Sequence, residues 1–287
     1  MTDKKNIGLA AMSGLLLTGA FPKIGLDWLA WFALVPLLYA MKDQSARGCF
    51  RLGFVGGLVH FLSLLYWLIS VMRTYGFLPL YLSVLILLFF AAVLALFKAS
   101  FAALLAVTSR KPIAYLIMTP LVWVALEYIR SFIFSGFPWE LLGYSQYERL
   151  HLIQISDIFG VYGLSALIAG VNAAIFIILL FLAKKRWRQI AISKQLAVGS
   201  AIVLILGVAL TWFYGYRRLE AVDRLIAAAP QARIAVIQGN IDQAVKWDPA
   251  FKTQTIEKYN QLSSEAAENN PDLIVWPETA MPFYLFH

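Results

Sequence analysis

Seven apolar segments, separated by short polar gaps, dominate the first 216 residues. They cover residues 7–21, 26–41, 50–72, 78–107, 113–129, 158–183 and 196–214. Most approach or exceed the roughly 20 residues that a helix needs to cross a bilayer. The first two follow each other closely with no small-residue cleavage site between them, so we expect a helical hairpin rather than a removed signal peptide. The pattern predicts a multi-pass α-helical membrane domain over residues 1–216, with about seven spans.

One gap differs from the others in length and composition. Residues 131–157 are too many for a turn, and Pro138 prevents a continuous helix. The segment is also rich in aromatic residues, and tryptophan and tyrosine side chains favour the headgroup level of a bilayer. The segment is therefore expected at a membrane interface, either as a plain anchor or as a platform that guides lipid toward a site above it. The aromatic residues concerned are Phe137, Trp139, Tyr144 and Tyr147.

After Tyr214 the long apolar segments give way to short apolar runs separated by polar residues. Short apolar runs bounded by turn residues indicate strands, and an Asp-Pro pair before a helical repeat indicates a capped helix. A strand, a helix and a strand at this spacing form a βαβ unit with parallel strands. Two strands are too few to cover a parallel sheet, so we expect residues 231–287 to be the truncated start of an α/β domain. The predicted elements are a helical linker at 217–230, a strand at 233–238, a helix at 250–268 capped by Asp248, and a strand at 273–276.

Composition and charge agree with a membrane location. Hydrophobic residues make up 61% of the chain and charged residues 14%, which excludes an ordinary soluble protein. The formal net charge is +8, but the basic residues lie in the gaps between apolar segments and not on one polar face, so nucleic acid is not an expected partner. Successive gaps lie on alternate sides of a membrane, and the side with more Lys and Arg faces the cytoplasm. The N-terminus belongs to the more basic set of gaps, so it is predicted to be cytoplasmic. With seven spans, the residues after about 216 would be extracytoplasmic.

Several polar residues fall within the apolar segments. We expect Lys98 to extend its amine along its own stem to the cytoplasmic interface. His60 is expected to play a hydrogen-bonded structural role. Glu127 is three residues from Arg130 on the same helix, so we expect the two side chains to pair.

Glu278 is the first charged residue after the predicted strand 273–276, where Pro277 ends the ladder. The ends of such strands commonly carry the chemistry of α/β folds. Apolar neighbours would partly desolvate this carboxylate and suit it to proton transfer near neutral pH. The alternative is an ordinary exposed glutamate. The apolar neighbours are Trp276, Met281, Phe283 and Tyr284.

Five sequence motifs together carry a family resemblance. They are VIQGNIDQAVKWDP and LIVWPETAMP near the C-terminus, and FPKIGLDWLAWFALVPLL, LEYIRSFIFSGFPWELLGYSQ and GVYGLSALIAGVN in the apolar region. In this order they resemble the apolipoprotein N-acyltransferases. The resemblance implies a bacterial inner-membrane enzyme with a nitrilase-like αββα sandwich after its membrane domain. It also implies transfer of an acyl chain from a phospholipid to the N-terminal amino group of a diacylglyceryl-cysteine lipoprotein, through a thioester on a cysteine.

The resemblance assigns roles to two residues of this sequence. Glu278 matches the glutamate of the family's Glu-Lys-Cys triad, whose role is general base, and Trp247 matches a loop tryptophan near the active-site mouth. The triad lysine and cysteine follow the glutamate in the family, as does a closing span, and this sequence continues for nine residues after Glu278. The one thiol, Cys49, is expected on the opposite side of the membrane as a packing residue. The chain is therefore expected to be inactive alone.

Two further function classes stay open at this level. The chain could be a membrane anchor or scaffold for a partner enzyme, which a stable 287-residue product in cells would favour. It could also begin an ordinary nitrilase-type amidase, against which stands the aromatic segment 131–157, since an enzyme for water-soluble amides has no need of it. The sequence shows no phosphate-binding loop, nucleotide motif or metal-ligand cluster, so no cofactor is expected.

Overall fold

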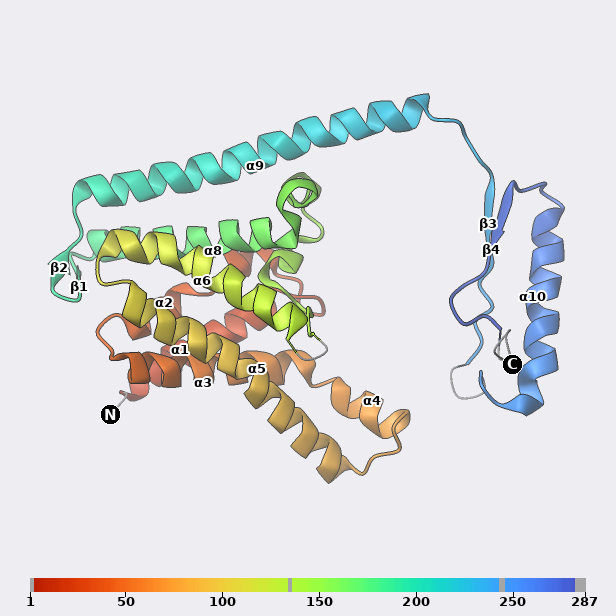
Figure 1. Cartoon of the computed structure of the whole chain (residues 1–287), viewed down its shortest axis with the longest axis horizontal. Coiled ribbons are helices and arrows are strands. Elements are labelled where there is room, and N and C mark those ends of the chain that lie inside the picture. The colour runs from red at the N-terminus through yellow and green to blue at the C-terminus, as the bar shows by residue number, and fades with distance from the viewer. Residues whose placement is uncertain (1–2, 134–135, 243–245, 282–287) are drawn as a thin grey trace. The chain divides into compact units, whose positions relative to one another are not determined.

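The computed structural model describes residues 3–133, 136–242 and 246–281, and the chain divides into two compact units (Figure 1). Unit 1 is Met1–Val222 and unit 2 is Asp223–His287. Unit 1 is a bundle of helices, and unit 2 carries a pair of parallel strands beside one helix.

Unit 1 is built almost wholly from helices, five of which are long and apolar enough to cross a membrane: α3, α5, α6, α8 and α9, counted over the described residues. Two 3₁₀ turns, η1 (Asp27–Trp31) and η2 (Leu142–Gln146), and a short antiparallel hairpin, β1 (Arg186–Trp187) with β2 (Ile190–Ala191), connect them. The helices are α1 (Lys4–Gly19), α2 (Val35–Met41), α3 (Ala46–Leu65), α4 (Leu68–Thr74), α5 (Leu80–Thr108), α6 (Pro112–Phe132), α7 (Leu150–Ile153), α8 (Ser156–Leu182) and α9 (Lys194–Ala228), the last of which extends into unit 2.

Close contact between α3 and α5 forms the centre of the bundle. A Cβ atom at Gly53 would lie 2.5 Å from the carbonyl oxygen of Lys98, and one at Gly57 would lie 2.9 Å from the Lys98 Cβ. Glycines on α3 therefore let the two backbones approach, as small residues do in membrane helix pairs. The main core includes Leu52, Phe101, Trp123 and Phe176, all buried.

The second apolar segment is not the single helix that the sequence predicts. It consists of η1, a turn and then α2, whose first turn contains Pro36. Proline lacks an N–H group and favours the first helical turn, so it sets the start of a new helix. Backbone groups freed by the break need protein partners at membrane depth. Asn172 on α8 supplies them: its Oδ1 accepts from Leu34 N at 2.9 Å and its Nδ2 donates to Ala30 O at 2.8 Å.

Helix α9 is 35 residues long and contains the predicted linker, because no proline interrupts it before Pro230. It approaches the short helix α7 at Gly215, where a Cβ atom would lie only 1.7 Å from the carbonyl oxygen of His151. Beside this contact the rings of His151 and Trp212 stack with centroids 5.1 Å apart, and Trp212 stacks on Tyr216 at 5.9 Å. The absence of a side chain at Gly215 is thus what lets α9 meet α7.

Unit 2 has the parallel strand–helix–strand order that the sequence predicts. Strand β3 (Ile234–Val236) pairs in parallel with β4 (Leu273–Val275), and η3 (Pro249–Phe251) and α10 (Lys252–Ala267) lie between them in sequence. Asp248 caps this helical stretch by accepting a hydrogen bond from Ala250 N at 2.9 Å. The described part of unit 2 is therefore a parallel α/β unit. Two parallel strands and one helix occur in many α/β folds, so they do not identify one fold family.

Gly215→Ala is expected to lower the stability of unit 1, because the added methyl group collides with the His151 backbone. Overpacking of this kind costs about 1–3 kcal/mol. The matched control is Gly199→Ala on the same helix, where nothing lies within 4 Å of the new Cβ. Thermal unfolding in detergent should show a lower midpoint for Gly215→Ala alone, and equal midpoints for both variants would contradict the contact.

Candidate functional site

The two residues that the sequence singles out lie on loops at one edge of the strand pair. In parallel strands the carboxyl ends meet at the same edge, so the loops after β3 and β4 emerge together. A hydrogen bond joins them: Lys246 Nζ donates to Thr279 Oγ1 at 2.5 Å. Lys246 precedes Trp247 and Thr279 follows Glu278, so the edge brings the two sequence motifs into contact.

The turn that carries Glu278 is fixed by its neighbours. Trp276 packs on Tyr259 of α10 with ring centroids 5.2 Å apart, and its Nε1 donates to Ser263 Oγ at 2.9 Å. On the other side Ala280 is buried. Between these anchors Thr279 has a φ of 56°, which is unfavourable for a β-branched residue. Strained backbone of this kind is concentrated at functional sites, where the surrounding structure maintains it.

The surroundings of Glu278 differ from the expectation of partial desolvation. Its side chain is exposed, and so is that of Trp247, at 48% of its full area. The reason is that Trp276, the nearest apolar neighbour, turns toward α10. Of the other apolar neighbours proposed from the sequence, Met281 is half-buried, and Phe283 and Tyr284 lie outside the described residues.

Cys49 lies in unit 1, whereas this edge belongs to unit 2. Its side chain is buried near the start of α3, and its Sγ is 3.6 Å from the carbonyl oxygen of Met41. A buried thiol among backbone carbonyls and apolar side chains acts as a small packing residue. Over the described ranges, no group of three or more His, Cys, Asp or Glu side chains could hold a metal ion.

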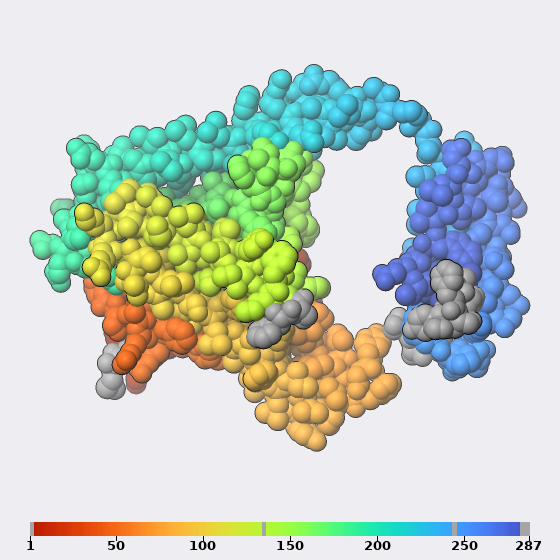
Figure 2. Space-filling view, viewed as in Figure 1, coloured from red at the N-terminus to blue at the C-terminus, as the bar shows by residue number. Residues whose placement is uncertain are grey.

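A second candidate site is an amphipathic cleft in unit 1, which the sequence analysis did not find. Helix α4 and the first turns of α5 stand out from the bundle (Figure 2), and a cleft of about 1170 Å³ is lined by residues of both. Lys23 and Arg73 line it, and Lys23 Nζ donates to Tyr66 Oη at 2.5 Å. Spacing alone could not bring Lys23 and Arg73 together, because 50 residues separate them in the sequence.

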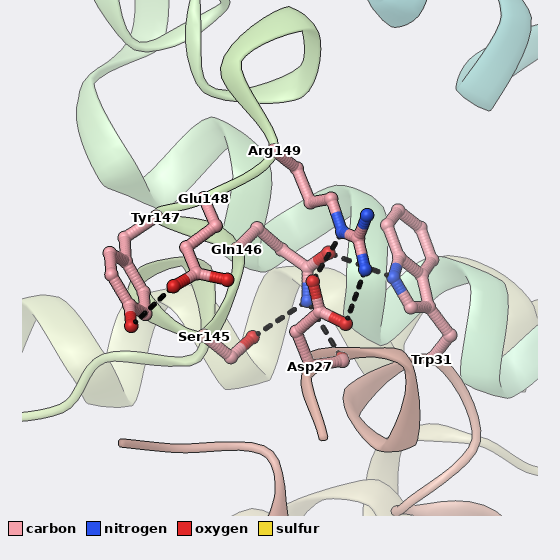
Figure 3. Close-up of polar contacts among 7 residues, drawn as sticks. All are labelled: Asp27, Trp31, Ser145, Gln146, Tyr147, Glu148 and Arg149. Atoms are coloured by element: carbon pink, nitrogen blue, oxygen red, sulfur yellow. Dashed lines mark hydrogen bonds and ion pairs between the residues drawn. The ribbon is translucent and has the colours of Figure 1, made fainter. Parts of the chain in front are cut away.

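The aromatic segment 131–157 is anchored to the bundle by a polar network. Arg149 forms a two-pronged ion pair with Asp27, with Nη2 2.9 Å from Oδ1 (Figure 3). Gln146 Nε2 donates to the carbonyl oxygen of Asp27 at 2.9 Å, and Gln146 Oε1 accepts from Trp31 Nε1 at 3.0 Å. The segment is thus tied to η1, while several of its aromatic side chains stay exposed: Trp139, Tyr144 and Tyr147.

The polar residues inside the helices give a mixed result. The structural role of His60 is confirmed, because its Nδ1 and Thr18 Oγ1 are hydrogen-bonded at 3.0 Å. The interfacial position expected for Lys98 is wrong: its Nζ lies 3.4 Å from the centroid of the Trp123 ring. A tryptophan face attracts a cation strongly, so the lysine stem turns toward α6 and not along α5.

The expected pair of Glu127 and Arg130 is also not found among the described residues. Glu127 Oε1 accepts hydrogen bonds from Trp123 Nε1 at 2.9 Å and from Leu142 N at 2.8 Å. Arg130 Nη1 donates to the carbonyl oxygen of Trp139 at 3.2 Å. Each side chain instead binds a backbone group of the segment after α6, and these hydrogen bonds replace the expected ion pair between them.

Glu140, in the same segment, is expected to make stability depend on pH. Burial raises the pKa of its carboxyl from 4.5 to about 7. The folded state thus holds this proton more tightly, so its contribution to stability is complete below about pH 4.5 and is lost as the pH rises through 7. Glu140→Gln should remove this slope in thermal midpoints measured between pH 4.5 and 8. Glu148→Gln, at an exposed carboxylate nearby, should keep it, and an unchanged slope in Glu140→Gln would contradict the assignment.

Comparisons with known proteins give the family. Residues 13–174 match the family model for the apolipoprotein N-acyltransferase N-terminal domain. The chain is similar to apolipoprotein N-acyltransferases from Geobacter metallireducens, 44% identical over 96% of this chain and 51% of the relative, and from Methylococcus capsulatus, 31% identical over 96% and 51%. One from Pasteurella multocida is 29% identical over 96% and 50%. The chain spans about half the length of these relatives. The match of more than half of its residues to the family model shows that the chain belongs to the apolipoprotein N-acyltransferase family.

Proposed function

We propose that this chain supplies the lipid-handling membrane domain and the general base of an enzyme that acylates lipoproteins. The reaction would transfer an acyl chain from a phospholipid to the N-terminal amino group of a diacylglyceryl-cysteine lipoprotein. The observation that carries the proposal is the family match, which extends with 44% identity to a relative named for apolipoprotein N-acylation. The relatives' names support lipoprotein substrates. That a phospholipid is the acyl donor is our proposal.

Glu278 would act in both halves of the reaction. In the first half it takes the proton of a cysteine thiol, and the thiolate attacks the phospholipid ester carbonyl. The ester C–O bond breaks as the thioester forms, and Glu278 gives the proton to the oxygen of the leaving lysophospholipid alcohol. In the second half the lipoprotein amine attacks the thioester, Glu278 takes the amine proton, and the thiol is released. Exposure of Glu278 at a strand edge supports access by both substrates.

The nucleophilic thiol of this scheme is not Cys49. That side chain is buried in unit 1 between helical backbone groups, whereas Glu278 belongs to unit 2. The triad cysteine and lysine that the resemblance calls for have no counterpart among the residues matching the family motifs here. The 287 residues alone are therefore proposed to be inactive, and activity belongs to a protein that supplies both groups.

The acyl donor would bind in the amphipathic cleft beside α4 and α5. Lys23 and Arg73 offer positive charge for a phosphate group, and exposed Phe77 and Leu80 offer apolar surface for acyl chains. Arginine and lysine are the usual partners of phosphate in proteins. The proposal places the N-terminus in the cytoplasm and the residues after about 216 outside it, in a bacterial inner membrane. A reporter fused after Gln231 that is active only in the cytoplasm would contradict this orientation.

Glu278→Gln in the full-length protein should greatly slow thioester formation, because the amide is the same shape and accepts no proton. General-base catalysis is worth about 10²–10⁴-fold, and the loss should fall in this range. Mass spectrometry of the protein after incubation with phospholipid measures the acylated species. Glu257→Gln, at an exposed carboxylate on α10, is the control and should acylate normally. Full acylation of Glu278→Gln would remove Glu278 from the mechanism.

Arg73→Gln in the full-length protein should raise the KM for phospholipid about tenfold with little change in kcat. Hydrogen bonds to charged groups contribute about 1.5–3 kcal/mol, and solvent in the open cleft reduces this. The matched control is Arg47→Gln, which removes an exposed arginine near the start of α3. Helix α4, which carries Arg73, follows the other end of α3. Steady-state kinetics with phospholipid in mixed micelles makes the comparison. Equal effects of the two substitutions would show a general charge effect and contradict a phosphate site at Arg73.

A further inference from the structure

A cluster of three ionisable side chains lies inside unit 1, between α5 and α6. Lys98 comes from α5, and Glu127 and Arg130 come from α6. Glu127 is 4% exposed and Arg130 3% exposed. Ionisable groups within membrane helices are costly and almost always have a partner or a role. The scheme proposed for acyl transfer uses none of the three.

One oxygen of the Glu127 carboxyl is fully used and the other is not. Oε1 accepts two hydrogen bonds, from Trp123 Nε1 and from Leu142 N. Oε2 is buried and has no hydrogen-bond partner within the described part of the protein. A buried carboxyl oxygen without a partner costs several times what a typical hydrogen bond contributes. This oxygen therefore calls for a donor.

A small cavity of about 10 Å³ is lined by Glu127. Its polar lining consists of Lys98, Glu127 and Arg130, and its other walls are apolar and aromatic side chains, among them Phe61, Phe101 and Trp123. The volume is about that of one water-sized sphere, and a buried water needs two to four polar partners. Lysine and arginine bring only donors and the carboxylate only acceptors. A water can accept from the first two and donate to the third.

We propose that this cavity is a binding site for one water molecule, which donates to Glu127 Oε2 and accepts from Lys98 Nζ and from the Arg130 guanidinium. The three side chains and the water then form one closed network with complementary charge. The site lies within a single unit, and its lining residues come from α3, α5 and α6.

The network also has a positioning role. Through Oε1, Glu127 holds the backbone N–H of Leu142, the first residue of η2, and through Nη1, Arg130 holds the carbonyl oxygen of Trp139. These two bonds fix the stretch 139–142 against α6. Among the described residues Lys98 shows no hydrogen bond to Leu142 or Trp139, so it acts on this stretch through the water and the Glu127 carboxyl. It is a positioning residue for the aromatic segment.

The test uses the full-length protein in lipid nanodiscs and needs no activity measurement, so its outcome is independent of the proposed acyl transfer. Hydrogen exchange is followed in a peptide covering residues 139–146 and in peptides of α3 and α5. Lys98→Met, which keeps the length of the stem and removes the donor, should speed exchange in 139–146 at least tenfold and leave α3 and α5 within threefold of the wild type. Lys194→Met, at an exposed lysine of unit 1, should change neither.

The double variant Lys98→Met with Glu127→Gln separates the network from simple loss of packing. A neutral amide no longer needs the lysine, so exchange in 139–146 should be slower in the double variant than in Lys98→Met alone. Additive effects, or faster exchange spread evenly over the helices, would overturn the positioning role. For the wild type, a density map that resolves ordered water should show one peak within hydrogen-bond distance of Glu127 Oε2 and Lys98 Nζ. A direct bond between these two atoms with no such peak would overturn the water site.

Discussion

Backbone groups that leave a helix within an apolar bundle have to be hydrogen-bonded by the protein itself, and this constraint shapes unit 1. It acts at two places. At the break between η1 and α2, Asn172 binds the backbone of Ala30 and Leu34. After α6, Glu127 binds Leu142 N, and Ser165 Oγ accepts from Gly143 N at 2.9 Å. Each irregular stretch is therefore held by a polar side chain from a continuous helix, as non-helical backbone at membrane depth requires.

The same constraint links the two irregular stretches to each other. Gln146 binds both the carbonyl oxygen of Asp27 and the Trp31 indole, and Arg149 binds the Asp27 carboxylate. A stretch that was only membrane-bound would need no such contacts with a distant turn. The exposed aromatic rings of segment 131–157 are thus presented from a fixed backbone.

Helix α9 follows a different rule from the rest of the bundle. Only three of its residues, Ala197, Ser200 and Gly215, are buried, while Val203, Ile205 and Leu210 are each more than 60% exposed. Apolar surface of this extent suits a helix whose neighbours are lipid chains, where exposure of branched side chains carries no cost. The contact at Gly215 then has particular weight, because few other side chains of α9 fix its position along the bundle.

The sequence by itself determined the features that depend on local composition and periodicity. Apolar runs predicted about seven spans and located the five long helices α3, α5, α6, α8 and α9. The Asp248 cap and the two short apolar runs identified the parallel strand–helix–strand unit. The five motifs together identified the family, since they depend on residue identity alone. Helix α9 shows the limit of this approach: the charged stretch after Tyr214 looked like a separate linker, yet it continues the helix because nothing before Pro230 stops it.

The tertiary structure decided everything that depends on partners far apart in the chain. Lys98 turns to Trp123 and Glu127 turns to Leu142, because α6 and the segment after it offer closer partners than the interface or Arg130. The break at Pro36 is tolerated only because Asn172, more than 130 residues later, binds the freed backbone. The contact of Lys246 with Thr279 requires both strand ends at one edge of the sheet. Spacing along a sequence carries no information on such pairs, since folding creates their proximity.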